Sequence, residues 1–381
     1  MFIIHALQMS LAMGWQILWP LVLGFALSGA IQAVVSHYQM SKLLPDSSPK
    51  TLLKASLLGA ASSSCSYAAV AMARSVFRKG GNFAAAMTFE IASTNLVIEL
   101  GIITWLLLGW QFALAEIIGG IVMILTLSVL FRKFLTKQLL QSAAAQTHKG
   151  LSGRMEGHAA MDDMAIKGDA PVLKKLFSKQ GITATSHFFV MDWASIWSDI
   201  VIGLLIAGAL AAWVPEHFWQ SFFFAGNPVL AAIWGPIVGP IIAMLSFVCS
   251  VGNIPLAVVL WNGGISFGGV ASFIFADLII VPILLIYKKY YGLKMSGFIL
   301  ATFYAAMVVA GYVVEGLFAL FRLTPTARGA ATLAPHLSFN YTTVLNIVLL
   351  LLAGALVWRF MRTGGPMMLK MMNKPHSHDQ L

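Results

Sequence analysis

The chain has 381 residues, of which 59% are hydrophobic and only 10% are charged. A soluble globular protein carries about 25% charged residues, so this composition excludes a water-soluble fold, a disordered chain and a protein that binds nucleic acid along its length. The formal net charge of +10 would suit a nucleic-acid partner, but the positions of the charges argue against one. The basic residues stand between and after long apolar runs, where the positive-inside rule places them in a membrane protein.

Seven apolar segments are each long enough to span a bilayer as a helix, which takes about 20 residues. In chain order they cover residues 12–35, 83–108, 110–131, 196–214, 266–287, 297–321 and 341–358. The sequence therefore predicts an all-α polytopic membrane protein. No cleavable signal peptide is evident, because the first residues lack a basic region and the first apolar run continues to Val35.

Two further apolar segments contain interruptions. Residues 52–77 carry the run Ser62-Ser63-Ser64-Cys65-Ser66, and residues 228–260 carry four prolines and the run Cys249-Ser250-Val251-Gly252-Asn253. Small, polar and helix-breaking residues at membrane depth are typical of broken or re-entrant helices that line a cavity. We expect each segment to enter the membrane and return as a hairpin; the alternative is that one or both cross it fully.

The basic residues indicate the orientation. Nine Lys and Arg residues lie in the loop 132–194, which we therefore place in the cytoplasm. Counting spans from this loop puts the N-terminus outside and the C-terminus inside, with seven spans and two hairpins. The stretch Pro171–Gln180 has the pattern of a short amphipathic helix on the membrane surface. Arg74 is expected to extend to the cytoplasmic surface.

The two interrupted segments resemble each other. Each has Cys-Ser, then an apolar half-helix, then Gly-Gly about 15 residues later, then a helix start rich in Phe, Ala and Gly. Gly80-Gly81 aligns with Gly263-Gly264 if one gap is allowed, and Ser93-Thr94-Asn95 falls near Asp277. In the predicted topology the two hairpins open from opposite sides. Matching halves of opposite orientation are typical of inverted-repeat secondary transporters, whose broken helices meet near the midplane.

These segments also carry a family resemblance. The chain resembles the organoarsenical efflux (ArsP-like) permeases over residues 12–133 and 196–321, in which Cys-Ser-Cys-Ser-x-x-Pro precedes a basic pair and glycine. The matching residues are Cys65, Ser66, Cys249, Ser250 and Pro255. The pattern's second cysteine is replaced by Tyr67 and Val251, and its first proline by Ala71. The resemblance implies an inner-membrane permease, and for some members of the family the efflux of trivalent organoarsenicals.

The polar residues of the two interruptions are the candidate substrate ligands. They are Cys65, Cys249, Ser62, Ser63, Ser64, Ser66, Ser250 and Asn253. Thiolates suit soft centres such as trivalent arsenic, and hydroxyl and amide groups can bind a solute or free backbone groups. The alternative is that these residues only allow close helix packing, since a free cysteine is often a small buried apolar residue.

Three acidic residues within apolar segments are candidates for ion coupling or for carrying a proton: Glu90, Glu99 and Asp277. A carboxyl group inside a membrane is costly and is a functional candidate by default. By position, Glu90 lies near one end of its helix, Glu99 lies deeper, and Asp277 lies in the middle of its helix. Glu116 and Glu315 lie nearer helix ends and are weaker candidates.

The expected organisation is a first membrane repeat (1–134), a cytoplasmic loop with a short amphipathic helix (135–194), an inverted second repeat (195–321), an additional transmembrane helix (322–361) and a cytoplasmic tail (362–381). Two cysteines without a CxxC pair predict neither a disulfide framework nor a zinc site, and no phosphate-binding loop is present. We expect no catalytic residues, no metal and no cofactor, and a partner set of a small-molecule substrate and the lipid bilayer, without nucleic acid.

The sequence thus predicts a secondary permease of a bacterial inner membrane that exports a small solute, such as a trivalent (organo)arsenical or another thiophilic compound. Two alternatives stay open. One is a permease or channel for a small anion. The other is a membrane-embedded enzyme with a cysteine nucleophile, which would need a base beside the thiol.

Overall fold

The computed structural model of the protein describes residues 2–34, 44–62, 66–78, 80–147, 172–213, 216–246, 250–325 and 341–367. Within these ranges every regular element is a helix and no strand is present. The all-α class expected from the composition is therefore confirmed. The predicted ligands Ser63, Ser64, Cys65 and Cys249, and the loop 148–171, lie outside the described residues.

The first half of the chain begins with a long helix and continues with two pairs of short helices and one full-length helix. These elements are α1 (Phe2–Val34), α3 (Pro49–Ser62), α4 (Ser66–Arg78), α5 (Phe83–Asn95), α6 (Ile98–Leu108) and α7 (Trp110–Phe134). Two short helices of the connecting region follow, α8 (Lys137–Thr147) and α10 (Val172–Leu176). The expected amphipathic helix is thus limited to α10, because Lys179 already belongs to the next long helix.

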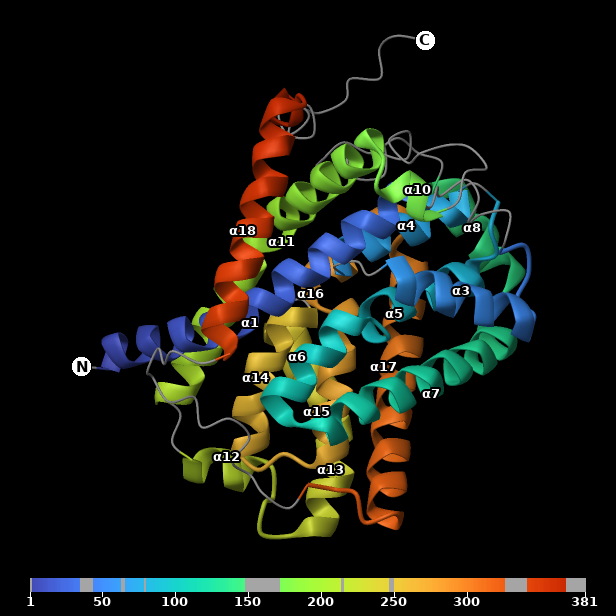
Figure 1. The fold of residues 1–381 in the computed structure, drawn as a ribbon. Coiled ribbons are helices and arrows are strands. Elements are labelled where there is room, and N and C mark those ends of the chain that lie inside the picture. Colours follow the sequence, from blue (N-terminus) through green and yellow to red (C-terminus); the bar gives the residue numbers. More distant parts are fainter. Residues whose placement is uncertain are drawn as a thin grey trace.

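The second half repeats this order of elements. It contains α11 (Lys179–Trp213), α12 (Glu216–Phe222), α13 (Pro228–Ser246), α14 (Ser250–Asn262), α15 (Phe267–Ile274) continued by the 3-10 turn η2 (Phe275–Leu278), α16 (Val281–Tyr291), α17 (Leu293–Leu320) and α18 (Tyr341–Arg362). The order α3 to α7, called repeat 1 below, corresponds element by element to the order α13 to α17, called repeat 2. Figure 1 shows α1 and α11 side by side, with α18 beside them.

Each repeat contains a bent helix pair where the sequence predicted one straight span. The angle is 41° between α5 and α6 and 42° between the α15–η2 helix and α16. The helices over 83–108 and 266–287 are therefore broken rather than continuous, and whether each pair crosses the membrane as one span stays a prediction. In repeat 2, Pro282 stands in the first turn of α16, where proline is favoured because its missing N–H is not needed. In repeat 1, Asn95 bonds back to the carbonyl of Ile91, which competes with continuation of the helix.

The surface of the helices agrees with a protein that crosses a membrane. On α7, Ile117, Ile121, Leu125 and Val129 recur every four residues and are all exposed. Such a continuous apolar stripe suits contact with lipid. By length and composition, four described helices can span a bilayer, and the two bent pairs bring this number to six.

The two interrupted segments are built differently. In repeat 1, α3 and α4 have 14 and 13 residues, fewer than a single span needs. In repeat 2, α13 has 19 residues and is long enough to cross. Pro236 and Pro240 lie inside α13 without interrupting it, so these two prolines do not mark the break that the sequence suggested. Whether each segment returns or crosses stays a prediction.

Candidate functional site

The centre of the site is the carboxyl group of Asp277, which lies in η2 and is fully buried. The Ser66 hydroxyl donates to Asp277 Oδ2 at 2.6 Å. The side chains of Asn95 and Ser250 approach the same carboxyl group, yet within the described residues Oδ1 has no hydrogen bond of ordinary geometry. Residues from both repeats therefore converge on one acidic group.

Within the described residues, two helices begin beside this carboxyl. Ser66 is the first residue of α4, and Ser250 is the first residue of α14. Both are buried. A helix N-terminus carries a partial positive charge and unsatisfied N–H groups, so the carboxyl of Asp277 lies where two such ends meet. Each serine directly follows a cysteine in the sequence, Cys65 and Cys249 respectively.

A second buried carboxyl group belongs to Glu90 in the middle of α5. The hydroxyl of Tyr287, on α16, donates to Glu90 Oε1. Glu90 Oε2 is buried and has no hydrogen-bond partner among the described residues. Glu90 and Asp277 lie close enough for their charges to interact. Glu90 is thus more deeply placed than its position in the apolar segment suggested.

The polar end of α5 turns toward this region. Ser93, Thr94 and Asn95 are all buried, and their side chains bond back to carbonyl groups of the same helix. Asn95 also donates to the Thr94 hydroxyl at 2.9 Å. These bonds satisfy the side-chain donors of a helix end that has no contact with water, whereas Asn95 Oδ1 has no partner among the described residues.

Of the remaining predicted ligands, Asn253 lies on the first turn of α14 and has no exposed surface. Neither its amide nitrogen nor its amide oxygen has a hydrogen-bond partner within the described part of the chain. A buried polar group without a partner is costly and needs an explanation, which a bound solute or water would supply. Ser62 differs, because its hydroxyl donates to the Gly59 carbonyl of its own helix at 2.9 Å.

The other acidic residues differ from expectation in depth. Glu99 was expected to lie deeper than Glu90, but it stands in the first turn of α6 and is only half-buried. Glu116 was expected nearer a helix end, but it is buried on α7 beside Thr104. The bend between α5 and α6 explains why Glu99 is less buried than Glu90, because the buried helix α5 ends before Glu99.

Arg74 is buried rather than extended to the surface as expected. It is the only Lys or Arg that is buried among the described residues. Its Nη2 donates to the Thr147 carbonyl at 3.0 Å, and its guanidinium lies 4.3 Å from the centre of the Tyr290 ring. Thr147 also donates to the Tyr290 carbonyl at 3.2 Å. Arg74 therefore joins α4 to α8 and α16.

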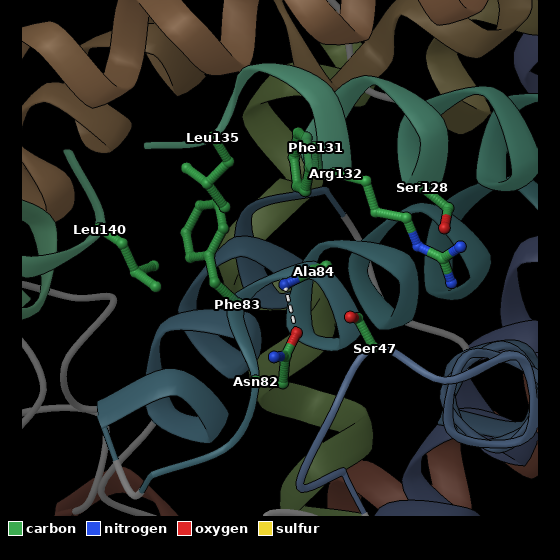
Figure 2. A pocket seen from close by; sticks show the side chains of 9 residues that line it. All are labelled: Ser47, Asn82, Phe83, Ala84, Ser128, Phe131, Arg132, Leu135 and Leu140. Atoms are coloured by element: carbon green, nitrogen blue, oxygen red, sulfur yellow. Dashed lines mark hydrogen bonds between the residues drawn. The ribbon is translucent and has the colours of Figure 1, made fainter. Parts of the chain in front are cut away.

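A pocket lies apart from these buried groups. Figure 2 shows it between the start of α5, the end of α7 and α8; its lining consists of Ser47, Asn82, Phe83, Ala84, Ser128, Phe131, Arg132, Leu135 and Leu140. None of the predicted site residues lines it. Among the described residues, no group of three or more His, Cys, Asp or Glu side chains is arranged to hold a metal ion.

Sequence reasoning missed two members of the buried cluster, Tyr287 and Asn95. Tyr287 stands beside Lys288 and Lys289 at the end of an apolar helix, as a tyrosine at a membrane surface does, and its contact with Glu90 comes only from the packing of α16 against repeat 1. Asn95 did give a signal, because it belongs to the polar run that aligns with Asp277 between the repeats.

Comparison with known proteins agrees with this architecture. A family described as "Predicted permease" matches residues 3–316. The chain is 59% identical, over 349 residues, to a protein of Mycobacterium tuberculosis (strain ATCC 25618 / H37Rv) named "Putative permease Rv2963". The matched region covers 91% of this chain and 86% of that protein. No solved structure matches the chain.

Proposed function

Since the chain belongs to the ArsP-like family of predicted permeases and is a multi-pass membrane protein, we propose that it is a secondary permease that exports a trivalent (organo)arsenical or another small thiophilic solute. The family points to transport rather than to catalysis. The substrate and the direction of transport rest on the site alone.

The strongest support for a thiophilic substrate is the convergence of α4 and α14 on Asp277. Ser66 donates to this carboxyl and Ser250 lies beside it. Each serine is joined by one peptide bond to a cysteine, and adjacent Cα atoms are about 3.8 Å apart. Both cysteines lie outside the described residues. We propose that their thiols reach the same centre, where two soft ligands could hold one arsenic atom.

The proposed substrate site consists of Cys65, Cys249, Ser62, Ser63, Ser64, Ser66, Ser250 and Asn253, with Glu90, Glu99 and Asp277 as coupling residues. Asn253 contributes a buried amide without a partner among the described residues. Of the coupling residues, Glu90 and Asp277 are the best supported because both carboxyl groups are fully buried. Glu99 is the least supported because it is only half-buried.

We further propose that repeat 1 and repeat 2 have opposite orientations in a bacterial inner membrane, with the N-terminus outside and the C-terminus inside. The matching order of elements and the similar bends support this arrangement. Halves of opposite orientation let a permease expose one central site alternately to either side.

A small anion is the second candidate substrate. The N-termini of α4 and α14 begin at one point, and converging helix ends favour a negative charge. In the described structure the carboxyl of Asp277 lies at this point. An anion would have to displace this group or bind beside its neutral form.

A tolerance test distinguishes the two substrates. The gene is expressed in a bacterial host without its own arsenical exporters, and growth is measured with trivalent methylarsenicals, antimonite, other thiophilic metals and small sulfur anions. Wild-type protein is expected to raise tolerance to the thiophilic compounds. The variant Cys65→Ser/Cys249→Ser should lose this tolerance at equal abundance in the membrane.

Serine keeps the size of cysteine and a hydrogen-bond donor, so transport of a hard anion should survive the double substitution. Full arsenical tolerance in the double variant would contradict thiol ligation. Ser272→Ala is the matched control, because within the described residues its buried hydroxyl bonds only to the carbonyl of Gly269 on its own helix. This control should keep wild-type tolerance.

A further inference from the structure

The two buried carboxyl groups are bound in a reciprocal way. Glu90 of repeat 1 accepts a hydrogen bond from Tyr287 of repeat 2. Asp277 of repeat 2 accepts one from Ser66 of repeat 1. Each repeat therefore supplies one acid and one hydroxyl, and each acid is held by the opposite repeat.

Neither acid has a cationic partner in the part of the chain that the structure describes. Within the described residues, no Lys or Arg forms an ion pair with Glu90 or Asp277, and Arg74 is engaged with Thr147 and Tyr290. The other titratable groups near them are Glu116 on α7 and Tyr287 and Tyr291 on α16. All of these side chains are neutral or acidic, so none of them compensates a negative charge. At Asp277 the partial positive charges of the α4 and α14 N-termini compensate it only in part.

Both acids also have an oxygen that lacks a partner. Glu90 Oε2 and Asp277 Oδ1 are buried and accept no hydrogen bond of ordinary geometry from the described residues. An ionised carboxylate without a cation and without its full set of donors is strongly disfavoured in an apolar interior. A proton on each group removes this charge and adds a donor.

We infer that Glu90 and Asp277 are two proton-binding sites of the transport cycle, each neutral while the hydroxyl of the opposite repeat holds it. This inference rests on the proposed function only in assuming that the protein is a permease whose repeats move relative to each other. It names the coupling ion, a proton, and the two cross-repeat contacts that bind it.

The contacts explain how protons would be exchanged. Movement of one repeat against the other separates Tyr287 from Glu90 and Ser66 from Asp277. Each acid then meets the water that fills the opened cavity and can release its proton to that side. When the repeats close again, the acid must take up a proton before it is buried. Closure of the repeats is thereby coupled to proton binding.

Infrared spectroscopy of the purified full-length protein tests the sites without any substrate. Protonated carboxyl groups give C=O bands apart from those of carboxylates. At neutral pH, Asp277→Asn and Glu90→Gln should each remove one such band. Ser66→Ala should shift the Asp277 band and Tyr287→Phe the Glu90 band, because each removes the hydrogen bond to that carbonyl.

The controls are a serine and a tyrosine whose hydroxyls bond to backbone carbonyls. Ser272 donates to Gly269 at 3.0 Å, and Tyr304 donates to Ile237 at 3.0 Å. Ser272→Ala and Tyr304→Phe should shift neither band. If Asp277→Asn and Glu90→Gln leave the spectrum unchanged at neutral pH, the acids are ionised and the inference is overturned. Equal shifts in test and control variants would overturn the reciprocal contacts.

A second measurement uses transport in proteoliposomes, with a trivalent methylarsenical as the probe. Asp277→Asn and Glu90→Gln imitate the protonated state permanently. They should keep exchange of solute for solute but lose uptake driven by a pH gradient. Uptake that stays driven by the pH gradient in both variants would contradict proton binding at these groups. Failure of the wild type to carry the probe would weaken only the proposed substrate, since the spectra do not depend on it.

Discussion

Repeat 1 and repeat 2 share the order of their helices but differ in the chemistry that they place at the centre. The serines that begin α4 and α14 occupy equivalent positions, and both reach the same carboxyl. The acids do not correspond. Glu90 lies in the middle of α5, whereas Asp277 lies in the last turn before the bend, where repeat 1 has Thr94 and Asn95.

The two repeats therefore share the arrangement of their helices but not the acidic side chains at the centre of the site. Under the proposed inverted-repeat arrangement, corresponding breaks of the two halves meet near their symmetry axis, which accounts for two half-helix ends at one point. The side chains at that point are unlike, so the carboxyl belongs to one repeat only. A site of this kind has different electrostatics on its two sides. Under the proposed function, an outward-open and an inward-open state would then differ in their affinity for a proton.

Both repeats use the same packing device beside the centre. A Cβ atom on Gly59 of α3 would lie 2.4 Å from the Phe89 carbonyl oxygen of α5. A Cβ atom on Gly239 of α13 would lie 2.5 Å from the Gly269 carbonyl oxygen of α15. Small residues let membrane helices approach backbone to backbone. In each repeat, the first helix therefore supports directly the helix that carries the acid.

The largest expected effect concerns the orientation of the two repeats in the membrane. It is an all-or-none difference in labelling from the outside. In a Cys65→Ser/Cys249→Ser background, Lys50→Cys and Asn227→Cys place a thiol just before or at the start of α3 and α13, at exposed positions. If the repeats are inverted, a membrane-impermeant maleimide labels Asn227→Cys in intact cells. Lys50→Cys is labelled only after the membrane is permeabilised.

Labelling of both variants from the same side would show that the repeats are parallel and would contradict their proposed opposite orientation. Lys288→Cys is a useful control, because Lys288 is an exposed residue near the end of α16 that the charge distribution places inside. It should behave like Lys50→Cys.

The next effect concerns the close helix packing in each repeat. Gly59→Ala and Gly239→Ala should each lower the free energy of unfolding by about 3 kcal/mol, the upper part of the range for overpacking, because the new methyl group meets backbone atoms that cannot rotate away. The thermal midpoint in detergent measures this loss.

Gly101→Ala on α6 and Gly297→Ala on α17 are matched controls, since a Cβ atom at either position meets nothing within 4 Å. Alanine favours a helix over glycine by up to about 1 kcal/mol, so the controls should unfold at the same temperature or higher. If only one of Gly59→Ala and Gly239→Ala destabilises, the two repeats do not share this device.

Much of the fold could be predicted because the bilayer requires apolar helices of a fixed length. Apolar runs of span length, basic loops and the repeated Cys-Ser and Gly-Gly pattern indicated the helices and their repetition. The bends near Leu96 and Ile279 could not be predicted in the same way. Hydropathy stays high through both positions, and the bends come from local bonding at Asn95 and from Pro282 at the start of a helix.

The site was predicted in part for a similar reason. Polar residues inside apolar segments are few, so Glu90, Asp277, Ser66, Ser250 and Asn253 could be chosen from the sequence as candidates. Their partners could not be chosen. Contact between α16 and repeat 1 depends on tertiary packing, and neither a tyrosine at the end of an apolar helix nor a buried arginine differs in the sequence from one at the membrane surface.

A smaller effect concerns a feature that repeat 1 has and repeat 2 lacks. Arg74 occupies the ninth position of α4, and the ninth position of α14 is Val258. Arg74→Ala should cost about 1.5–3 kcal/mol, as for the loss of a hydrogen bond to a charged group, because the Thr147 carbonyl loses its donor and the Tyr290 ring loses the guanidinium. Thermal unfolding in detergent checks this.

Two variants sharpen the result. Arg74→Lys should recover only part of the loss, because an ammonium group lacks the planar fork that stacks on Tyr290 while it binds the carbonyl. Arg78→Ala, an exposed residue at the end of the same helix, should leave the thermal midpoint unchanged. Equal losses for Arg74→Ala and Arg78→Ala would show that the buried contacts contribute nothing specific.

The smallest effect compares how the two repeats cap the helix that carries the acid. Asn82 Oδ1 accepts hydrogen bonds from Ala84 N at 2.9 Å and Ala85 N at 3.3 Å at the start of α5. At the start of α15, Ser266 accepts a single bond from Gly269 N at 3.1 Å, and Glu315 of α17 accepts one from Gly268 N. Repeat 2 therefore divides between two side chains what one residue does in repeat 1.

Loss of a helix cap costs about 0.5–2 kcal/mol. Asn82→Ala should fall in the middle of this range, because both first-turn donors lose their acceptor together. Ser266→Ala should cost less, since the Glu315 carboxyl still binds Gly268 N and its negative charge suits a helix N-terminus. The loss in free energy of unfolding caused by Ser266→Ala should be larger in a Glu315→Ala background. There it should equal the loss caused by Asn82→Ala in the wild type. If Ser266→Ala alone is as destabilising as Asn82→Ala, then the carboxyl of Glu315 does not share the cap.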